Sequence, residues 1–238
     1  MSEQLVHIEH LTKYYGAKKA LNDVNLNIDG GRIIGLLGPN GSGKTTLIKL
    51  LNGLLQPDAG EIYINGNKPG VITKSEVSYL PDRPYFGDWM KVEDVLKLFS
   101  DFYWDFDRDR AETMCRALDI STKSKIKTLS KGMKEKVQLI LVMSRSAKLY
   151  LLDEPIAGVD PAARDLILDT ILANYNPDST IIISTHLIGD IERVLDEVIF
   201  LKEGNIVLHD TTDNIREREG MSIDELFRDV FKAPKMRW

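Results

Sequence analysis

The chain has 238 residues and a formal net charge of −5, and 43% of its residues are hydrophobic. This length and composition are typical of a globular protein with one large α/β domain or two small ones. The negative charge argues against nucleic acid as a partner, because nucleic-acid-binding domains usually present a basic surface. The single cysteine, Cys115, excludes an intrachain disulfide and is expected to face the core. No run approaches the roughly 18 apolar residues of a membrane span, and no signal peptide is visible.

The first part of the chain is predicted to be rich in β-structure. Short apolar runs predict strands at residues 5–9, 21–28, 33–37 and 61–64. Asn65-Gly66 follows the last of these runs, and this dipeptide favours a tight turn. Apolar residues then recur at helical spacing from Val92 to Tyr103. Two more helices are expected at 109–118 and 134–143.

Beyond residue 145, predicted strands and helices alternate. The strands are expected at 149–152 and 181–184, and the helices at 161–175 and 187–195. Asp160 and Pro161 mark the start of the first of these helices, as N-cap and first helical residue. A hairpin of residues 198–201 and 206–208 follows, and then an amphipathic helix at 222–231. Apolar parallel strands that alternate with helices predict an α/β fold whose sheet is covered on both faces.

Residues 38–45 read Gly-Pro-Asn-Gly-Ser-Gly-Lys-Thr and match the pattern G-x-x-x-x-G-K-[ST] at every fixed position. A predicted strand precedes the pattern and a helix follows it, which disfavours a glycine-rich turn that matches by chance. The glycines let backbone N–H groups surround a phosphate, Lys44 reaches the β- and γ-phosphates, and the Thr45 hydroxyl is a ligand for Mg²⁺. The residues expected to bind the nucleotide here are Gly38, Pro39, Asn40, Gly41, Ser42, Gly43, Lys44, Thr45 and Thr46.

Two later strands end in polar residues that suit the same chemistry. The strand at 149–152 leads into Asp153 and Glu154, of which the first suits Mg²⁺ and the second suits an attacking water. A strand with a solvated acidic end is the alternative, and the preceding phosphate-binding loop disfavours it. His186 follows the next strand; a lone histidine there is usually structural, but its place after the other two motifs favours a function. We expect Glu154 and His186 to be catalytic, and Thr45 and Asp153 to bind Mg²⁺.

From about residue 5 to residue 208 the chain resembles the nucleotide-binding domain of ATP-binding-cassette (ABC) transporters. Residues 129–133, Leu-Ser-Lys-Gly-Met, are similar to the family signature, usually Leu-Ser-Gly-Gly-Gln, and residues 158–160 resemble its D-loop. Tyr15 resembles the aromatic residue that stacks on adenine, although a tyrosine near the N-terminus is common by chance. The resemblance implies that the residues that also take part in nucleotide binding are Tyr15, Asp160 and, towards the γ-phosphate on a partner subunit, Ser130 and Gly132.

The resemblance also implies the architecture. It is a P-loop NTPase core of the α/β class, with an N-terminal antiparallel β subdomain and an inserted helical subdomain. We expect an ABC-type ATP-binding domain at 1–210, with the helical insertion at about 85–140, and a C-terminal helical tail at 211–238. In the family the insertion receives the coupling helices of the membrane subunit, and exposed apolar residues often mark partner surfaces. We expect about half of its aromatic cluster to be core, the cluster being Tyr85, Phe86, Trp89, Tyr103, Trp104 and Phe106.

The chain departs from the family at two places. Asp82 stands where the family has the Q-loop glutamine, and we expect its carboxylate to bind Mg²⁺. Because it also brings negative charge near the phosphates, either the site tolerates the charge or hydrolysis and coupling are altered. The alternative is that Asp82 is a turn residue after Pro81 whose side chain faces water. In the signature, Lys131 replaces glycine and Met133 replaces glutamine; Lys131 either adds a cation beside the phosphate or points into solvent.

The resemblance implies the ATPase subunit of a membrane transporter, which binds and hydrolyses MgATP as a dimer and drives a separate transmembrane permease. The dimer partner is a second copy or a paralogous subunit, and no nucleic acid is expected. The details resemble export-type systems of antibiotic and lantibiotic resistance. Such a subunit is cytoplasmic and sits on the inner face of the cell membrane through its permease. A soluble ABC ATPase without a permease and a nucleotide-sensing module with little turnover remain as alternatives.

Overall fold

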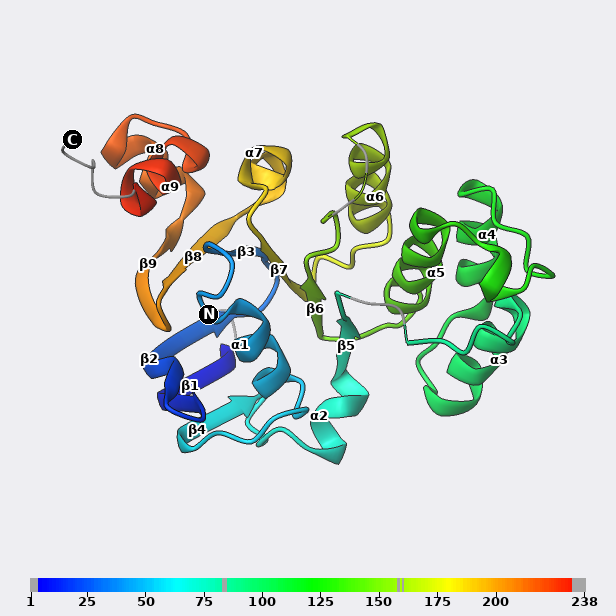
Figure 1. Cartoon of the computed structure of the whole chain (residues 1–238), viewed down its shortest axis with the longest axis horizontal. Helices are drawn as coiled ribbons and strands as arrows, with labels where there is room; N and C mark the ends of the chain where they lie inside the picture. The colour runs from blue at the N-terminus through cyan, green and yellow to red at the C-terminus, as the bar shows by residue number, and fades with distance from the viewer. Residues whose placement is uncertain (1–3, 83–84, 158, 160, 233–238) are drawn as a thin grey trace.

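The computed structural model describes residues 4–82, 85–157, 159 and 161–232, and in these the chain forms two sheets (Figure 1). The smaller sheet is antiparallel and has the order β2-β1-β4, with β1 (Gln4–Tyr15), β2 (Lys18–Asp29) and β4 (Ala59–Ile64). The larger has the order β5-β6-β7-β3-β8-β9, and its neighbours run parallel except β9, which is antiparallel to β8. Its strands are β3 (Ile33–Leu37), β5 (Val77–Leu80), β6 (Leu149–Asp153), β7 (Thr180–Thr185), β8 (Glu197–Lys202) and β9 (Asn205–Thr211).

Both faces of the larger sheet are covered, which confirms the predicted α/β class. One face packs against α1 (Lys44–Leu51) and the antiparallel sheet. The other face packs against helices that follow later in the chain: α5 (Lys131–Met143), α6 (Pro161–Ala173), α7 (Ile188–Ile191), α8 (Thr212–Glu219) and α9 (Ile223–Phe231). At the β5 edge, α3 (Val92–Phe102) and α4 (Arg108–Ala117) pack with α5 into a helical layer (Figure 1). The remaining short helices are α2 (Val71–Glu76), η1 (Ile126–Thr128) and η2 (Glu192–Val194).

Strand β3 shows why the sheet strands read as continuous apolar runs. Ile34 and Leu36 belong to the core on the α1 face, whereas Ile33 and Leu37 belong to the core on the opposite face. Successive side chains of a strand point to opposite faces, so a strand buried on both faces needs apolar residues throughout. Cys115 lies in the same core as Leu37, and burial raises the pKa of its thiol to about 11, as expected of a core-facing residue.

The strand order brings three carboxyl ends together. Because β6, β7 and β3 are neighbours in register, Asp153 pairs with Ser184, and Thr185 pairs with Leu37 directly before the phosphate-binding loop. Ligands of open parallel sheets bind at this edge. The topology therefore assembles the site from three segments that are far apart in the sequence.

Most predicted elements are present, and the differences have physical causes. The strands β1 and β2 are longer than predicted. Most of residues 10–15 of β1 and both residues 18–19 of β2 are exposed or only partly buried, so they form no apolar run. Helix α2 was not predicted, because its apolar residues Val71 and Ile72 are exposed and form no buried stripe. The helix expected at 187–195 is instead α7 followed by the 3-10 turn η2. The turn begins at Glu192, whose carboxylate accepts backbone N–H groups at the start of α9.

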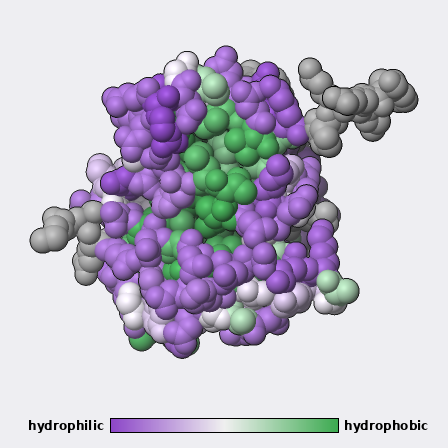
Figure 2. Space-filling view, turned by 90° about the vertical axis from the view of Figure 1, so that its left-hand side faces the viewer, coloured by the Kyte–Doolittle hydropathy of each residue, from purple (hydrophilic) through white to green (hydrophobic). Residues whose placement is uncertain are grey.

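The C-terminal helix α9 packs on the sheet, and its capping box explains where it starts. Ser222 and Glu225 exchange hydrogen bonds with each other's backbone N–H groups. Phe227 and Phe231 pack against Phe200 of β8. Figure 2 shows the side of the molecule that carries β9, α8 and α9, where an apolar band crosses an otherwise polar surface. None of the helices in the described ranges is long and apolar enough to cross a bilayer.

Candidate nucleotide-binding and hydrolytic site

The phosphate-binding loop connects β3 to α1, and glycine is required at its end. Gly43 is the N-cap of α1 with φ of 113°, and a Cβ there would lie 2.6 Å from the carbonyl oxygen of Ala20. Ser42 donates its backbone N–H to Pro39 O at 3.2 Å, which closes the loop. Its Oγ is buried and has no hydrogen-bond partner among the described residues. Buried polar atoms are normally paired, so this hydroxyl is a candidate hydrogen-bond partner for a bound phosphate.

Lys44 lies under the loop and is 5% exposed. Its Nζ donates to Gly38 O at 2.7 Å and lies 3.5 Å from Glu154 Oε1. Burial lowers the pKa of Lys44, and the negative charge of Glu154 partly offsets that shift. The ammonium therefore has anionic and carbonyl partners that a phosphate group can replace or complement.

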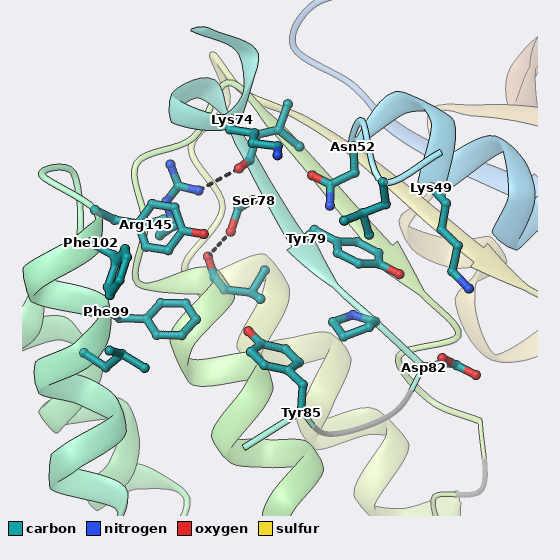
Figure 3. A pocket seen from close by; sticks show the side chains of 16 residues that line it. Lys49, Asn52, Lys74, Ser78, Tyr79, Asp82, Tyr85, Phe99, Phe102 and Arg145 are labelled. Atoms are coloured by element: carbon teal, nitrogen blue, oxygen red, sulfur yellow. Dashed lines mark hydrogen bonds between the residues drawn. The ribbon is translucent and has the colours of Figure 1, made fainter. Parts of the chain in front are cut away.

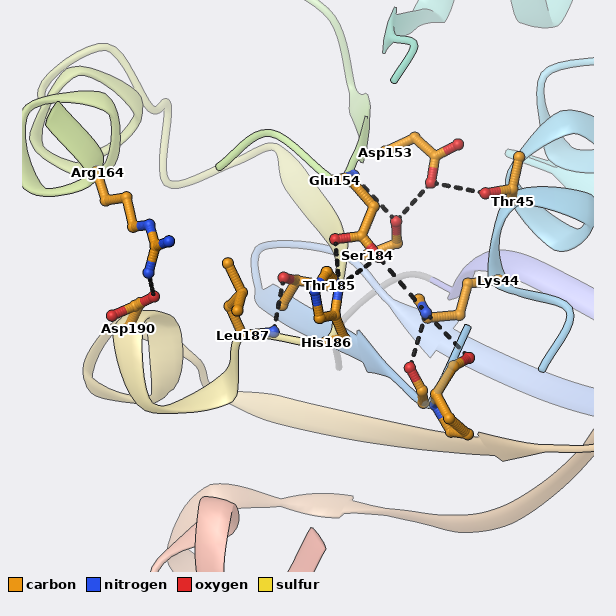
Figure 4. Close-up of polar contacts among 12 residues, drawn as sticks. Lys44, Thr45, Asp153, Glu154, Arg164, Ser184, Thr185, His186, Leu187 and Asp190 are labelled. Atoms are coloured by element: carbon orange, nitrogen blue, oxygen red, sulfur yellow. Dashed lines mark hydrogen bonds and ion pairs between the residues drawn. The ribbon is translucent and has the colours of Figure 1, made fainter. Parts of the chain in front are cut away.

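Asp153 is fully buried at the end of β6, and its two oxygens have different surroundings (Figure 4). Oδ1 accepts hydrogen bonds from Ser184 Oγ at 2.6 Å and Thr45 Oγ1 at 3.1 Å. Oδ2 is buried without a hydrogen-bond partner in the described part of the chain. Burial raises the pKa of Asp153, while the two hydroxyl donors oppose the shift. An unsatisfied buried carboxylate oxygen beside a threonine hydroxyl fits a hard cation such as Mg²⁺.

The described residues contain no group of three or more His, Cys, Asp or Glu side chains arranged to hold a metal ion. Mg²⁺ that binds together with a nucleotide is usually held by one or two carboxylates, waters and substrate phosphates. Thr45 and Asp153 are the protein groups that would hold it.

Glu154 lies between Lys44 and His186, as Figure 4 shows. Its φ of 53° is uncommon for a residue with a side chain, and its backbone N–H is fixed to Ser184 O at 3.0 Å. The His186 Nδ1 atom lies 3.2 and 3.1 Å from Oε1 and Oε2 of Glu154. The side chain of Glu154 is 15% exposed and that of His186 is 40% exposed. A constrained carboxylate that still reaches solvent is suited to accept a proton from water.

One open hollow of about 360 Å³ joins the loop to three of the other expected site residues, Tyr15, Asp82 and Glu154. Tyr15, half exposed at the end of β1, lines it together with Asp82 and Glu154. The loop residues that line it are Asn40, Gly41, Gly43, Lys44, Thr45 and Thr46, and Lys18 and Ala20 also contribute. The hollow thus lies between an exposed aromatic ring and the phosphate-binding loop. A bound nucleotide with its base on the ring and its phosphates in the loop would occupy this position.

Asp82 lies two residues beyond the end of β5, after Pro81, and is exposed. It lines the hollow together with Thr45 and Glu154, and its negative charge contributes to the raised pKa of Asp153. This supports a place beside the expected Mg²⁺ position over a turn residue that faces only water.

The signature-like residues lie elsewhere. Ser130 is the N-cap of α5, with its Oγ accepting from Met133 N at 3.2 Å, and both Ser130 and Gly132 are exposed. Neither residue lines the hollow described above. The side chain of Lys131 is 75% exposed, with Nζ 3.8 Å from Glu135. Asp160, expected to contact nucleotide, lies outside the described residues.

Sequence reasoning missed Ser184, which is buried and bonds both Asp153 and the backbone of Glu154. A polar residue at the end of the run Ile181-Ile182-Ile183 was a signal that could have identified it. The backbone contacts of the loop with β2 were also missed, because Ala20 and Gly43 approach each other only in the folded chain.

A second cavity, a groove of about 670 Å³, lies between the core and the helical layer (Figure 3). Tyr79, Tyr85, Phe99 and Phe102 surround it, with Lys49 and Asp82 at one end. On its floor the buried Arg145 bonds Asp105 at 3.1 Å through both Nε and Nη2, and Val77 O at 2.6 Å. The expectation that about half of the aromatic cluster is core is met only in part, because none of its six residues is fully buried. Half of it is exposed (Tyr85, Trp89, Trp104) and half is partly buried against the core (Phe86, Tyr103, Phe106).

Comparison with known proteins agrees with this geometry. The family model described as ABC transporter matches residues 21–157. An uncharacterized ABC transporter ATP-binding protein of Methanocaldococcus jannaschii is 36% identical over 215 residues, which cover 88% of this chain and 79% of that protein. The SkfA peptide export ATP-binding protein SkfE of Bacillus subtilis is 30% identical, over 86% of this chain and 88% of that protein. A solved structure of the ATP binding subunit of an ABC transporter has a TM-score of 0.86 and 31% identity, and the match covers 96% of this chain and 100% of that one.

The P-loop, the Asp153-Glu154 strand end and His186 therefore stand in a cassette that is related to these proteins in sequence and in fold. The chain belongs to the ABC transporter family, and it is an ATP-binding subunit that hydrolyses ATP.

Proposed function

We propose that the chain is the ATPase subunit of a transporter for export, which works as a dimer on a separate membrane permease. The observation that carries the proposal is the meeting of Lys44, Asp153, Glu154 and His186 at one edge of the sheet, beside a hollow that reaches Tyr15. ATP would place its phosphates in the loop at residues 38–45 and its base against the exposed ring of Tyr15. Lys44 would then exchange its contact with Gly38 O for the β- and γ-phosphates.

Thr45 and Asp153 are the protein groups proposed to hold Mg²⁺, with Asp82 as a further ligand. The Oδ2 atom of Asp153, which has no hydrogen-bond partner among the described residues, supports this assignment. When bound there, Mg²⁺ supplies positive charge that offsets the charge of the phosphates. The Ser184 hydroxyl keeps the Asp153 carboxylate oriented by binding its other oxygen.

Glu154 is the proposed general base. It accepts a proton from a water whose oxygen attacks the γ-phosphorus, while the bond from that phosphorus to the β-γ bridging oxygen breaks and ADP leaves with the electron pair. His186 contacts both oxygens of Glu154 and is proposed to hold that carboxylate towards the water. The fixed backbone of Glu154 supports the same role, because it limits the positions that the side chain can reach.

A dimer is proposed because one chain leaves part of the site unused. Ser130 and Gly132 are exposed at the start of α5, and they do not line the hollow of their own chain. A second copy, or a paralogous subunit, would bring these residues to the γ-phosphate from outside. A Glu154→Gln variant should then accumulate as an ATP-bound dimer in size-exclusion chromatography with light scattering. A variant that stays monomeric at saturating ATP would contradict the dimer.

The groove between the core and the helical layer is the proposed docking place for the permease. Its exposed apolar lining supports this use, with Phe102 76% exposed and Leu54 53% exposed. The variant Phe102→Ser should lose co-purification with the permease. Leu166→Ser on α6 is the control, because Leu166 is 39% exposed and does not line the groove. Equal loss in both variants would argue against the groove.

The direct test of the function is reconstitution. If a neighbouring gene encodes a multi-span membrane protein, that protein is expressed together with the chain, and ATP hydrolysis is measured with and without it in proteoliposomes. Stimulation of hydrolysis and ATP-dependent peptide efflux support a coupled exporter, the activity that the name of SkfE gives to that relative. Hydrolysis that no membrane fraction changes, without co-purification, would instead indicate a soluble ABC ATPase.

A further inference from the structure

We propose that Arg164 is a positioning residue for hydrolysis, which acts by joining the loop after Glu154 to the helix after His186. The inference rests on the roles proposed above for Glu154 and His186. Arg164 itself lies away from the hollow and does not line it; Figure 4 shows it on α6, apart from the cluster around Glu154.

The guanidinium of Arg164 contacts both segments at once. Its Nε donates to Val159 O at 3.0 Å, five residues beyond Glu154. Its Nη1 donates to Asp190 Oδ2 at 2.7 Å, four residues beyond His186. An arginine holds several donors in a rigid plane, so these two contacts fix the distance between the two segments more firmly than two separate side chains would.

Both segments need such a tie. The Glu154 backbone has a positive φ, which persists only where the surroundings fix it. His186 is 40% exposed and its ring has one described side-chain partner, Glu154. The helix α7 has four residues, and a helix this short does not keep its place by its own hydrogen bonds. Its place is therefore set by the packing of Ile188 and Ile191 and by the contacts of Asp190.

The chain contains a matched control. Arg193 and Asp165 form a second ion pair between η2 and α6, with Nη2 2.8 Å from Oδ1. These side chains are 58% and 66% exposed, whereas those of Arg164 and Asp190 are 23% and 37% exposed. Arg193 joins the same two parts of the molecule without contacting the loop after Glu154. If hydrolysis needed only some ion pair between α6 and the segment after His186, loss of either pair would lower the rate.

Loss of the tie should slow the chemical step and spare ATP binding. Misplacement of a catalytic group by about 1 Å can cost about 100-fold in rate, so Arg164→Met is expected to lower kcat about ten- to 100-fold. KM and ATP affinity should stay within about twofold of wild type, because the contacts of Lys44 and Thr45 are untouched. Arg164→Lys should be intermediate, because an ammonium does not reproduce the planar fork. Arg193→Met should keep wild-type turnover.

The decisive readout is a double-mutant cycle with His186→Ala, followed by single-turnover hydrolysis with enzyme in excess. If Arg164 acts by placing His186 against Glu154, Arg164→Met has little further effect once His186 is absent. The same fold loss in both backgrounds would overturn the proposal and leave Arg164 with a structural role. If His186→Ala removes all measurable turnover, a second double-mutant cycle combines Arg164→Met with Asp190→Asn instead. The proposal is supported if the two single variants lose hydrolysis rate equally and the double variant loses no more than either. It is overturned if the two losses of rate are independent and multiply in the double variant.

Two further measurements separate the possible failures. Thermal unfolding of every variant shows whether a loss of rate reflects a loss of folded protein. ATP hydrolysis that persists in Lys44→Ala and Glu154→Gln would contradict the proposed site itself. If those two variants are inactive and Arg164→Met hydrolyses ATP like the wild type, the site stands and the positioning role of Arg164 is wrong.

Discussion

The Thr45 hydroxyl lies 3.1 Å from Oδ1 of Asp153, so the first turn of α1 meets the carboxyl end of β6 at one carboxylate. Ser184 of β7 donates to the same oxygen at 2.6 Å. The carboxylate of Asp153 thus joins three elements of the site. Groups that are already in place cost little reorganisation during the reaction.

Replacement of the P-loop lysine should abolish function. Lys44→Ala removes the cation that faces the phosphates, and a hydrogen bond to a charged group is worth about 1.5–3 kcal/mol. We expect ATP affinity to fall about ten- to 100-fold and turnover to be lost. Titration with a fluorescent ATP analogue and a steady-state ATPase assay measure both. Lys49→Ala, on the last turn of the same helix, is the control and should bind ATP normally. Near-normal affinity and turnover in Lys44→Ala would refute the P-loop assignment.

Asp82 should make hydrolysis unusually dependent on Mg²⁺. An anionic oxygen is a stronger ligand for Mg²⁺ than an amide oxygen, but without the cation it repels the γ-phosphate. Hydrolysis by the wild type should therefore rise more steeply with Mg²⁺ than that of Asp82→Gln, and Asp82→Ala should be less active at every concentration. In EDTA, Asp82→Gln should bind ATP more tightly than the wild type does.

Mg²⁺ titrations at fixed ATP, and ATP binding with and without EDTA, check these expectations for the three proteins. Superimposed curves would mean that Asp82 is a loop residue that faces water.

Glu197 should contribute stability that is lost in acid. It is 8% exposed, forms an ion pair with Arg32, and lies 3.2 Å from Nε2 of His209. The His209 hydrogen bond and the Arg32 charge hold the pKa of Glu197 below its usual range. A carboxyl whose pKa is lower in the folded state adds stability above its unfolded pKa of about 4.3 and loses it as pH falls through the folded pKa.

Glu197→Gln should accordingly lower the free energy of unfolding by about 1–2 kcal/mol at pH 7, and the difference from the wild type should shrink below about pH 4. Urea unfolding at a series of pH values measures it. The exposed Glu203→Gln is the control. A difference that stays constant from pH 7 to pH 3 would mean that ionisation of Glu197 does not stabilise the fold.

The sequence allowed the phosphate-binding loop and the strands β3, β6 and β7 to be predicted, because each has a local pattern of glycines or buried apolar residues. The contacts of Ser184 and Arg164 could not be predicted, because each depends on segments that only strand order brings together. The division of the helix after His186 into α7 and η2 is a similar case. Its cause is the contact of Glu192 with the start of α9, about 30 residues away in the chain.

Glu154 is the proposed base for ATP hydrolysis in a site built around Lys44. Single-turnover hydrolysis by Glu154→Gln tests it most directly, with ATP binding measured on the same sample. The amide keeps the shape of the side chain and loses its basic oxygen, so we expect normal ATP affinity and a hydrolysis rate at least about 100-fold lower. Hydrolysis at the wild-type rate by a variant that binds ATP normally would contradict the account.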